Sequence, residues 1–127
     1  MALKKPKYLM EFEAVKKNAL AEKPIQALDA RSALRHSEQQ IPQSTSMPYS
    51  ILFNEDRTLK NSNELRKLFA AKNVDLNSDI FTTCGSGVTA AIVAHALSTI
   101  GKDVSVYDGS MSEWQVRAPD LIDSDVQ

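Results

Sequence analysis

The stretch from Asp79 to Ile100, with the sequence DIFTTCGSGVTAAIVAHALSTI, contains the features that decide the fold of this chain. Its first five residues favour a β-strand, and the alanine-rich run from Val88 onward contains no helix breaker. Between them lie the chain's single cysteine, Cys84, and a short loop with two glycines. We therefore expect a strand, a tight loop and a helix, with Cys84 where the strand ends.

The loop after Cys84 is suited to holding a negatively charged atom. Gly85 and Gly87 permit backbone conformations that other residues avoid, so several N–H groups can point to the centre of the loop. The positive end of the following helix dipole adds to this effect and favours a thiolate or a persulfide on Cys84. From position alone, two interpretations stay open: a nucleophile, or a buried and inert cysteine at the end of a core strand.

Length and charge limit the functions that are possible. The chain has 127 residues, which is the size of one domain, and we expect its core to span about residues 8–122. Its 15 basic and 16 acidic residues do not favour nucleic acid or an anionic membrane as a partner. A single cysteine cannot form an internal disulfide, and no apolar run approaches the roughly 20 residues of a transmembrane helix. We expect a cytoplasmic protein, with the mitochondrion as the alternative.

Elsewhere, the spacing of apolar residues predicts short strands that alternate with helices. The expected elements, in chain order, are a helix over Tyr8–Leu20, a strand over 25–28, an irregular loop over 37–48, a helical turn over 48–53, a helix over Asn61–Lys72 capped by Asn61 or Ser62, and a strand over 104–107 closed off from the preceding helix by Gly101. This alternation predicts an α/β fold with a central, mainly parallel sheet flanked by helices. Ligands then bind at the carboxyl ends of the strands, where Asp29 and Cys84 lie.

Two other functions fit parts of the Cys84 loop. Gly85, Gly87 and Ala90 match the G-x-G-x-x-G/A spacing of dinucleotide-binding loops, and Asp108 lies near the expected acidic position. Too little chain follows this loop, however, to supply the remaining strands of a dinucleotide fold. A phosphatase loop with C-x5-R spacing requires an arginine where this chain has Ala90, so the bidentate clamp on a phosphate is lost.

Several short motifs occur in a characteristic order along the chain. They are Leu28-Asp29-Ala30-Arg31-Ser32 with Arg35 following, Ile41-Pro42, Met47-Pro48-Tyr49, the loop from Cys84 to Ala90, and Val106-Tyr107-Asp108-Gly109-Ser110 with Glu113-Trp114. In this order they resemble the carboxy-terminal, catalytic domain of the rhodanese superfamily, specifically the 3-mercaptopyruvate/thiosulfate sulfurtransferases. The resemblance implies a single rhodanese-like domain whose cysteine accepts a sulfur atom as a persulfide and passes it to a second acceptor.

The resemblance also implies roles for individual residues. Cys84 corresponds to the sulfur-carrying nucleophile, and the residues expected to hold the substrate or the persulfide are Arg35, Gly85, Ser86, Gly87, Val88 and Thr89. For Arg35 the alternative is a solvated surface charge, whereas Arg31 is expected to form a structural ion pair with Asp29. A neutral Gly-Ser-Gly loop is typical of the mercaptopyruvate-preferring members, and the single carboxylate of that substrate suits one arginine.

Some positions depart from the family pattern. The segment that carries a second substrate arginine is shortened here to 36–40, Gln43 stands in place of a turn glycine, and Ser46 in place of an asparagine. Met111 stands where a tryptophan is usual. Two hypotheses follow: a sulfurtransferase using 3-mercaptopyruvate or thiosulfate, and a catalytically impaired sulfur carrier or protein-binding module of the same fold.

The partners follow from the same resemblance. We expect a small-molecule sulfur donor, a thiol acceptor such as thioredoxin or glutathione (cyanide is the other acceptor), and no metal or cofactor. Because the family's enzymes are commonly tandem, a homodimer or an amino-terminal rhodanese domain is expected to cover the cleft. His95 is expected to be a packed helix residue, and His36 a surface-loop residue, with substrate contact as the alternative. Trp114, with Leu121 and Ile122, is expected to close the core.

Overall fold

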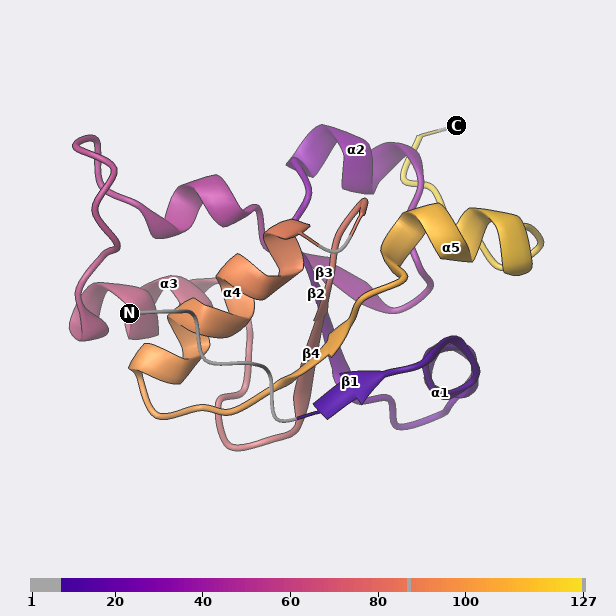
Figure 1. The fold of residues 1–127 in the computed structure, drawn as a ribbon, viewed down its shortest axis with the longest axis horizontal. Helices are drawn as coiled ribbons and strands as arrows, with labels where there is room; N and C mark the ends of the chain where they lie inside the picture. The colour runs from indigo at the N-terminus through magenta and orange to yellow at the C-terminus, as the bar shows by residue number, and fades with distance from the viewer. Residues whose placement is uncertain (1–7, 87, 127) are drawn as a thin grey trace.

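A computed structural model describes residues 8–86 and 88–126 of the chain, and its centre is a five-stranded sheet (Figure 1). The strands are β1 (Tyr8–Met10), β2 (Gln26–Asp29), β3 (Ser44–Ser46), β4 (Ile80–Thr83) and β5 (Ser105–Tyr107). Their order is β1-β5-β4-β2-β3, and every neighbouring pair is parallel. The carboxyl ends of β2, β4 and β5 therefore lie along one edge of the sheet, where Cys84 follows β4.

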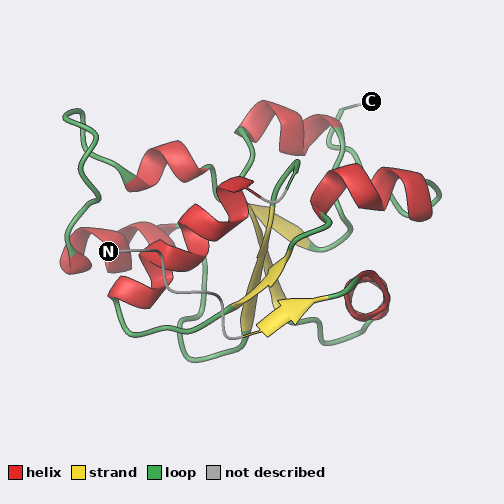
Figure 2. Cartoon of the chain, in the orientation of Figure 1, coloured by secondary structure: helices red, strands yellow, loops and turns green. Residues whose placement is uncertain are grey.

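Helices cover both faces of the sheet. They are α1 (Phe12–Ala19), α2 (Ala33–Glu38), the 3-10 helix η1 (Tyr49–Leu52), α3 (Ser62–Ala71), α4 (Val88–Thr99) and α5 (Ser110–Arg117). Figures 1 and 2 show α3 and α4 on one side of the sheet and α1 and α5 on the other. The predicted α/β fold with a parallel sheet is confirmed. Within the described residues, no helix has the length and apolar character that crossing a membrane requires.

The sheet separates two apolar cores. One core packs η1, α3 and α4 against β2 and β4, and its fully buried side chains include Leu52, Leu65, Phe69 and Leu97. The other core packs α1 and α5 against the opposite face, around Trp114. The ring of Trp114 lies 5.4 Å from that of Phe12, and its Nε1 donates to the Leu121 carbonyl at 2.7 Å. Trp114 and Leu121 close this core, as predicted.

The start of α3 and the end of α4 lie at the residues that the sequence predicts as their limits. The side chain of Asn61 accepts a hydrogen bond from the Glu64 N–H at 2.9 Å, so Asn61 is the cap of α3. Gly101 follows α4 with a φ of 84°, a left-handed conformation that favours glycine. Both helix ends and the helical turn at η1 confirm the predictions.

The amino-terminal part of the helix predicted over Tyr8–Leu20 is wrong. Tyr8–Met10 forms the edge strand β1, in register with Ser105–Tyr107 of β5, and the helix begins only at Phe12. An edge strand of three residues is held by main-chain pairing with its neighbour, which leaves no signature in the spacing of apolar side chains. Leu9, which fits the helical pattern, is instead 63% exposed.

The irregular loop predicted over 37–48 is also partly wrong, because it contains strand β3 and the end of α2. Every residue of β3 is a serine or threonine of intermediate burial, so the strand has no apolar alternation to reveal it. Ser32 caps helix α2, which begins at Ala33, and its hydroxyl accepts the Arg35 N–H at 3.3 Å. No prediction covered α5, which starts at Ser110 in a left-handed conformation, with a φ of 54°.

Replacing Trp114 by alanine should destabilise the protein strongly. The change empties a fully buried site beside Phe12 and removes the bond to Leu121, so we expect the free energy of unfolding to fall by about 3–5 kcal/mol. Val116→Ala is the matched control, because Val116 lies on the same helix but is 75% exposed, and its effect should stay within about 0.5 kcal/mol. Urea denaturation of both variants measures the difference, and equal effects would contradict the assigned core.

Candidate functional site

The loop after β4 is fastened to the start of α5 through Cys84. The thiol is fully buried, at 0% exposure. The Cys84 carbonyl accepts the Met111 N–H at 2.8 Å, and the Gly85 carbonyl accepts the Ser112 N–H at 2.9 Å. The Cys84 N–H donates to the Ser110 hydroxyl at 3.0 Å. These three bonds join the segments that follow β4 and β5, two strands that are neighbours in the sheet but distant in sequence.

Ser110 is a further site residue, and it lies against the sulfur. Its hydroxyl oxygen is 3.7 Å from Cys84 Sγ and 2.8 Å from the Tyr107 carbonyl oxygen. A serine hydroxyl has one proton, so donation to the sulfur and donation to the carbonyl are alternatives. Ser110 ends the motif Val106-Tyr107-Asp108-Gly109-Ser110, and nothing in the sequence indicates that its side chain lies beside the sulfur. That position depends on a left-handed backbone that turns the side chain toward Cys84, and only the fold supplies it.

The turn that carries Ser110 is fixed by Tyr107 and Glu113. The Tyr107 hydroxyl donates to Glu113 Oε1 at 2.8 Å. Burial, and then this bond and the charge of Glu113, raise the pKa of Tyr107 well above its usual range, so the phenol stays a donor. A Cβ at Gly109 would overlap the Glu113 carboxylate, so a larger residue there would displace the side chain that accepts from Tyr107.

Asp29, at the carboxyl end of β2, is compensated by Arg31. The carboxylate is 1% exposed and accepts the Arg31 backbone N–H at 2.9 Å and its Nη2 at 2.7 Å. The predicted structural ion pair is therefore confirmed. Arg31 Nη2 also donates to the Gln39 carbonyl at 2.6 Å, next to the end of α2. The charge of this guanidinium is thus compensated within the protein, and its Nε and Nη2 donors are used there.

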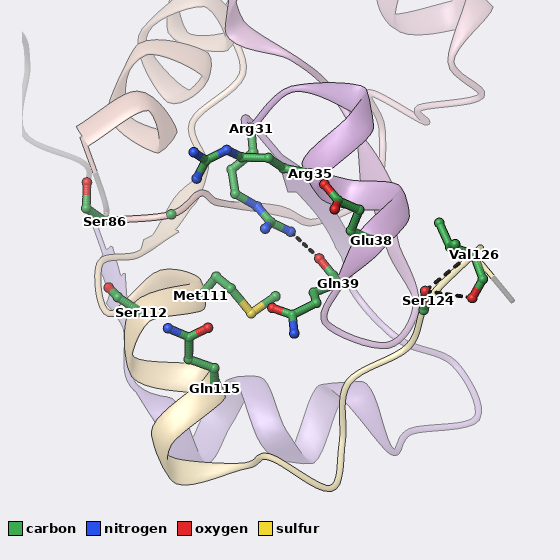
Figure 3. A pocket seen from close by; sticks show the side chains of 11 residues that line it. Arg31, Arg35, Glu38, Gln39, Ser86, Met111, Ser112, Gln115, Ser124 and Val126 are labelled. Atoms are coloured by element: carbon green, nitrogen blue, oxygen red, sulfur yellow. Dashed lines mark hydrogen bonds between the residues drawn. The ribbon is translucent and has the colours of Figure 1, made fainter.

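An open pocket of about 820 Å³ lies beside the Cys84 loop (Figure 3). It is lined by Arg31, Arg35, Glu38, Gln39, Gly85, Ser86, Met111, Ser112, Gln115, Ser124 and Val126. The predicted residues Arg35, Gly85 and Ser86 are therefore brought together. In Figure 3 the Arg35 guanidinium extends from α2 toward the side where Ser86 lies.

The other predicted loop residues have different positions. Val88 is 69% exposed, and neither Val88 nor Thr89 lines this pocket. Gly87 lies outside the described residues. Among the lining residues that the sequence did not indicate, Glu38 and Gln115 come from α2 and α5, two helices that no prediction covered. Their side chains became recognisable as site residues only when the fold placed both helices around the pocket.

The histidines lie away from the pocket lining. His36 is not in a surface loop but on α2, buried, with its Nε2 3.0 Å from the Ser44 hydroxyl. It serves the packing of α2 against β3. His95 is partly buried on α4, as predicted, and its Nδ1 has no hydrogen-bond partner among residues 8–86 and 88–126. The described part of the chain holds no group of His, Cys, Asp and Glu arranged for a metal ion.

Comparison with known proteins gives a consistent result. Residues 13–117 match the family model described as the rhodanese-like domain. The chain is 36% identical to thiosulfate/3-mercaptopyruvate sulfurtransferase 2 of Arabidopsis thaliana over 92% of its own length, and 35% identical to human 3-mercaptopyruvate sulfurtransferase over 89%. The crystal structure of the 3-mercaptopyruvate sulfurtransferase SseA from Escherichia coli, at 34% identity, superimposes with a TM-score of 0.72 and covers 85% of this chain.

These relatives are longer than the chain itself. The chain spans 37% of the Arabidopsis thaliana protein, 42% of the human protein and 44% of the Escherichia coli chain. The comparison therefore covers one part of each relative.

The two arginines of the pocket should respond differently to replacement. Arg31→Met leaves the Asp29 carboxylate buried without its counter-charge, so we expect the free energy of unfolding to fall by about 3–5 kcal/mol. Arg35→Met removes an exposed side chain that is unpaired in the described part of the chain, and its effect should stay below about 0.5 kcal/mol. Urea denaturation of the two variants measures both free energies of unfolding. A large loss of stability for Arg35→Met would contradict the assignment of Arg35 as the arginine without a structural partner in the described part of the chain.

Proposed function

Because the chain belongs to the rhodanese-like domain family, we propose that it is a sulfurtransferase that carries sulfur as a persulfide on Cys84. Its relatives at 35–40% identity are named sulfurtransferases. The observation that supports the proposal most directly is the position of the Cys84 loop. The two residues after Cys84, Gly85 and Ser86, line a pocket. The Arg35 guanidinium lines the same pocket and can bind the anionic group of a substrate.

In the first half-reaction the Cys84 thiolate attacks the sulfur of 3-mercaptopyruvate. The carbon–sulfur bond breaks, and its electron pair leaves with the carbon as the enolate of pyruvate, which then takes up a proton. Arg35 holds the substrate carboxylate during this step. The keto group is essential, because it stabilises the charge that develops on the leaving carbon.

In the second half-reaction a thiolate acceptor attacks the outer sulfur of the persulfide. The sulfur–sulfur bond breaks, its electron pair returns to Cys84 Sγ, and the outer sulfur leaves on the acceptor. The Ser110 hydroxyl, whose oxygen lies 3.7 Å from Sγ, is placed to donate a hydrogen bond to the sulfur when negative charge returns there. Thioredoxin, glutathione and related thiols are acceptors of the required chemistry.

The charges of the pocket favour 3-mercaptopyruvate over thiosulfate. Since Arg31 is neutralised by Asp29, Arg35 is the cation that remains for an anion, and the Glu38 carboxylate faces the same space. Thiosulfate has two negative charges, and the second finds no unpaired cation among the described lining residues. A monoanionic donor meets the attraction of Arg35 with less repulsion from Glu38.

Incubation with 3-mercaptopyruvate should add one sulfur atom to the protein. Cys84 is the only cysteine of the chain, so intact-mass measurement reports its modification directly. Cys84→Ser, incubated in parallel, should gain no mass, and a reducing thiol should reverse the gain in the wild type. A wild-type protein that never gains sulfur from 3-mercaptopyruvate or thiosulfate would refute the proposed function.

Steady-state kinetics test the role of Arg35. Arg35→Met should lower kcat/KM for 3-mercaptopyruvate by about tenfold to a hundredfold, the loss expected when a hydrogen-bonded carboxylate loses its charged partner. Arg57→Met, which removes an exposed arginine from the loop after η1, is the matched control and should keep the wild-type value. The wild type should also use 3-mercaptopyruvate better than thiosulfate. If both variants lost the same factor in kcat/KM, the proposed role of Arg35 in substrate binding would be wrong.

The second candidate function, a sulfur carrier or protein-binding module, is favoured by one specific observation. Within the described lining, Arg35 is the single unpaired arginine, and a carboxylate lies beside it. Such a pocket holds small anions weakly. A persulfide that forms on Cys84 without multiple turnover of either donor would favour the carrier over the enzyme.

A further inference from the structure

Residues 123–126, which we call the strap, lie beside α2 at the wall of the pocket, and Figure 1 shows them in yellow next to that helix. The Gln40 N–H donates to the Asp123 carbonyl at 2.9 Å, and the Asp123 N–H donates back to the Gln40 carbonyl at 2.9 Å. The Asp125 N–H donates to the Ser37 carbonyl at 2.8 Å. Main-chain hydrogen bonds therefore pair the strap with the end of α2 and with the residues that follow it.

Helix α2 needs such a partner because it is short. It has six residues, and an isolated helix of this length is not stable in water. The last carbonyls of a helix have no partner inside the helix and must be bonded from outside. In α2 the Ser37 carbonyl accepts the Asp125 N–H and, at 3.3 Å, the Ser124 hydroxyl. The strap thus caps the carboxyl end of α2.

The residues before the strap are fixed in the core around Trp114. Leu121 and Ile122 pack against this core, and the indole N–H of Trp114 donates to the Leu121 carbonyl at 2.7 Å. Trp114 belongs to α5, the helix whose first residues bond to Cys84 and Gly85. The strap therefore connects α2 with the helix that holds the Cys84 loop.

We propose that the strap is a positioning element for the donor: by capping α2, it holds Arg35 beside the Cys84 loop. The proposal rests on the proposed function, in which Arg35 binds the donor carboxylate, and adds residues that act through Arg35. Ser37, which the strap bonds, is two positions after Arg35 on the same helix, so the turn that carries the guanidinium cannot move far while these bonds last. Asp125 contributes its backbone N–H, whereas its side chain is exposed.

Loss of the cap should weaken donor binding without changing the chemistry at the sulfur. If the end of α2 opens, only the fraction of molecules with Arg35 in place binds the donor well, and the apparent KM rises by the inverse of that fraction. The Cys84 thiol and the Ser110 hydroxyl follow β4 and β5, outside α2 and the strap, so kcat should be kept. A loss of folded protein would instead lower the apparent kcat and leave KM unchanged.

Two substitutions at Asp125 separate the N–H from the carboxylate. Asp125→Pro removes the N–H that bonds the Ser37 carbonyl, and Asp125→Ala keeps it while removing the same exposed carboxylate. We expect Asp125→Pro to raise KM for 3-mercaptopyruvate by about threefold to tenfold, the effect of losing one or two hydrogen bonds, with kcat within about twofold of the wild type. Asp125→Ala should keep both wild-type values. Steady-state kinetics with dithiothreitol as the acceptor measure both constants.

A variant of Arg35 tests whether the strap acts through this side chain. In protein that already has Arg35→Met, the further change Asp125→Pro should raise KM no more, because two changes to one interaction are not additive. Hydrogen exchange gives a readout that does not depend on activity. The His36 and Gln39 amides, which bond carbonyls within α2 and at its cap, should exchange faster in Asp125→Pro than in Asp125→Ala.

The outcomes distinguish this inference from the proposed function. A wild type that forms no persulfide refutes sulfur transfer itself. A wild type that turns over 3-mercaptopyruvate, with an unchanged KM in Asp125→Pro, overturns the positioning role alone. The same rise of KM in the Arg35→Met background would show that the strap acts independently of Arg35 and would also overturn it. Equal hydrogen exchange of α2 in the two Asp125 variants overturns the proposed cap, whatever the kinetics show.

Discussion

A carboxylate that is 1% exposed, that of Asp29, has to be compensated inside the protein, and much of the site is arranged around this requirement. Arg31 supplies both its guanidinium and its own backbone N–H to the carboxylate, which satisfies the charge and the acceptor oxygens together. The same guanidinium reaches the Gln39 carbonyl beyond α2. This ion pair lies at the carboxyl end of β2, and the same arginine binds the segment that follows α2. It also neutralises one of the two arginines that line the pocket.

This commitment of Arg31 decides the electrostatics of the pocket. A lining with two available arginines would attract dianions, whereas the lining present here has one available guanidinium and one available carboxylate among its described residues. The charge of the pocket is therefore a consequence of how the chain satisfies a buried group, and not only of which residues line the cavity. Counting basic residues in the sequence around Arg31 and Arg35 would have given the wrong charge.

The sequence predicted the fold where apolar spacing or a cap records it. The helix over Val88–Thr99, the Asn61 cap and the left-handed Gly101 follow from local chemistry and are all present. Strands β1 and β3 were not predicted, because three-residue edge strands depend on main-chain pairing with a neighbour and need no apolar pattern.

In the candidate site, too, features set by local sequence could be predicted, whereas features set by the tertiary fold could not. Cys84 and its glycine loop were recognisable, since a strand, a cysteine and a helix lie in one continuous stretch. Ser110 and Glu38 were not, because their positions beside that loop depend on a left-handed turn and on a six-residue helix. Arg35 was indicated by the family resemblance. Only the structure shows that Arg31 is paired with Asp29, whereas Arg35 has no ion pair within the described residues.

The thiol of Cys84 is completely buried, and for the second half-reaction the chemistry of a persulfide reconciles this burial with sulfur transfer. Sγ of Cys84 is held beside the Ser110 hydroxyl, out of contact with solvent. A persulfide extends the side chain by one sulfur atom, and the residues next in the chain, Gly85 and Ser86, line the pocket. On the proposed function, the inner sulfur therefore stays in its polar, buried setting while the outer sulfur is the atom that an acceptor meets. A buried leaving sulfur beside a hydroxyl donor, with only the transferred atom reachable, favours attack at the outer sulfur over attack at the inner one, and attack at the outer sulfur is the step that transfers it.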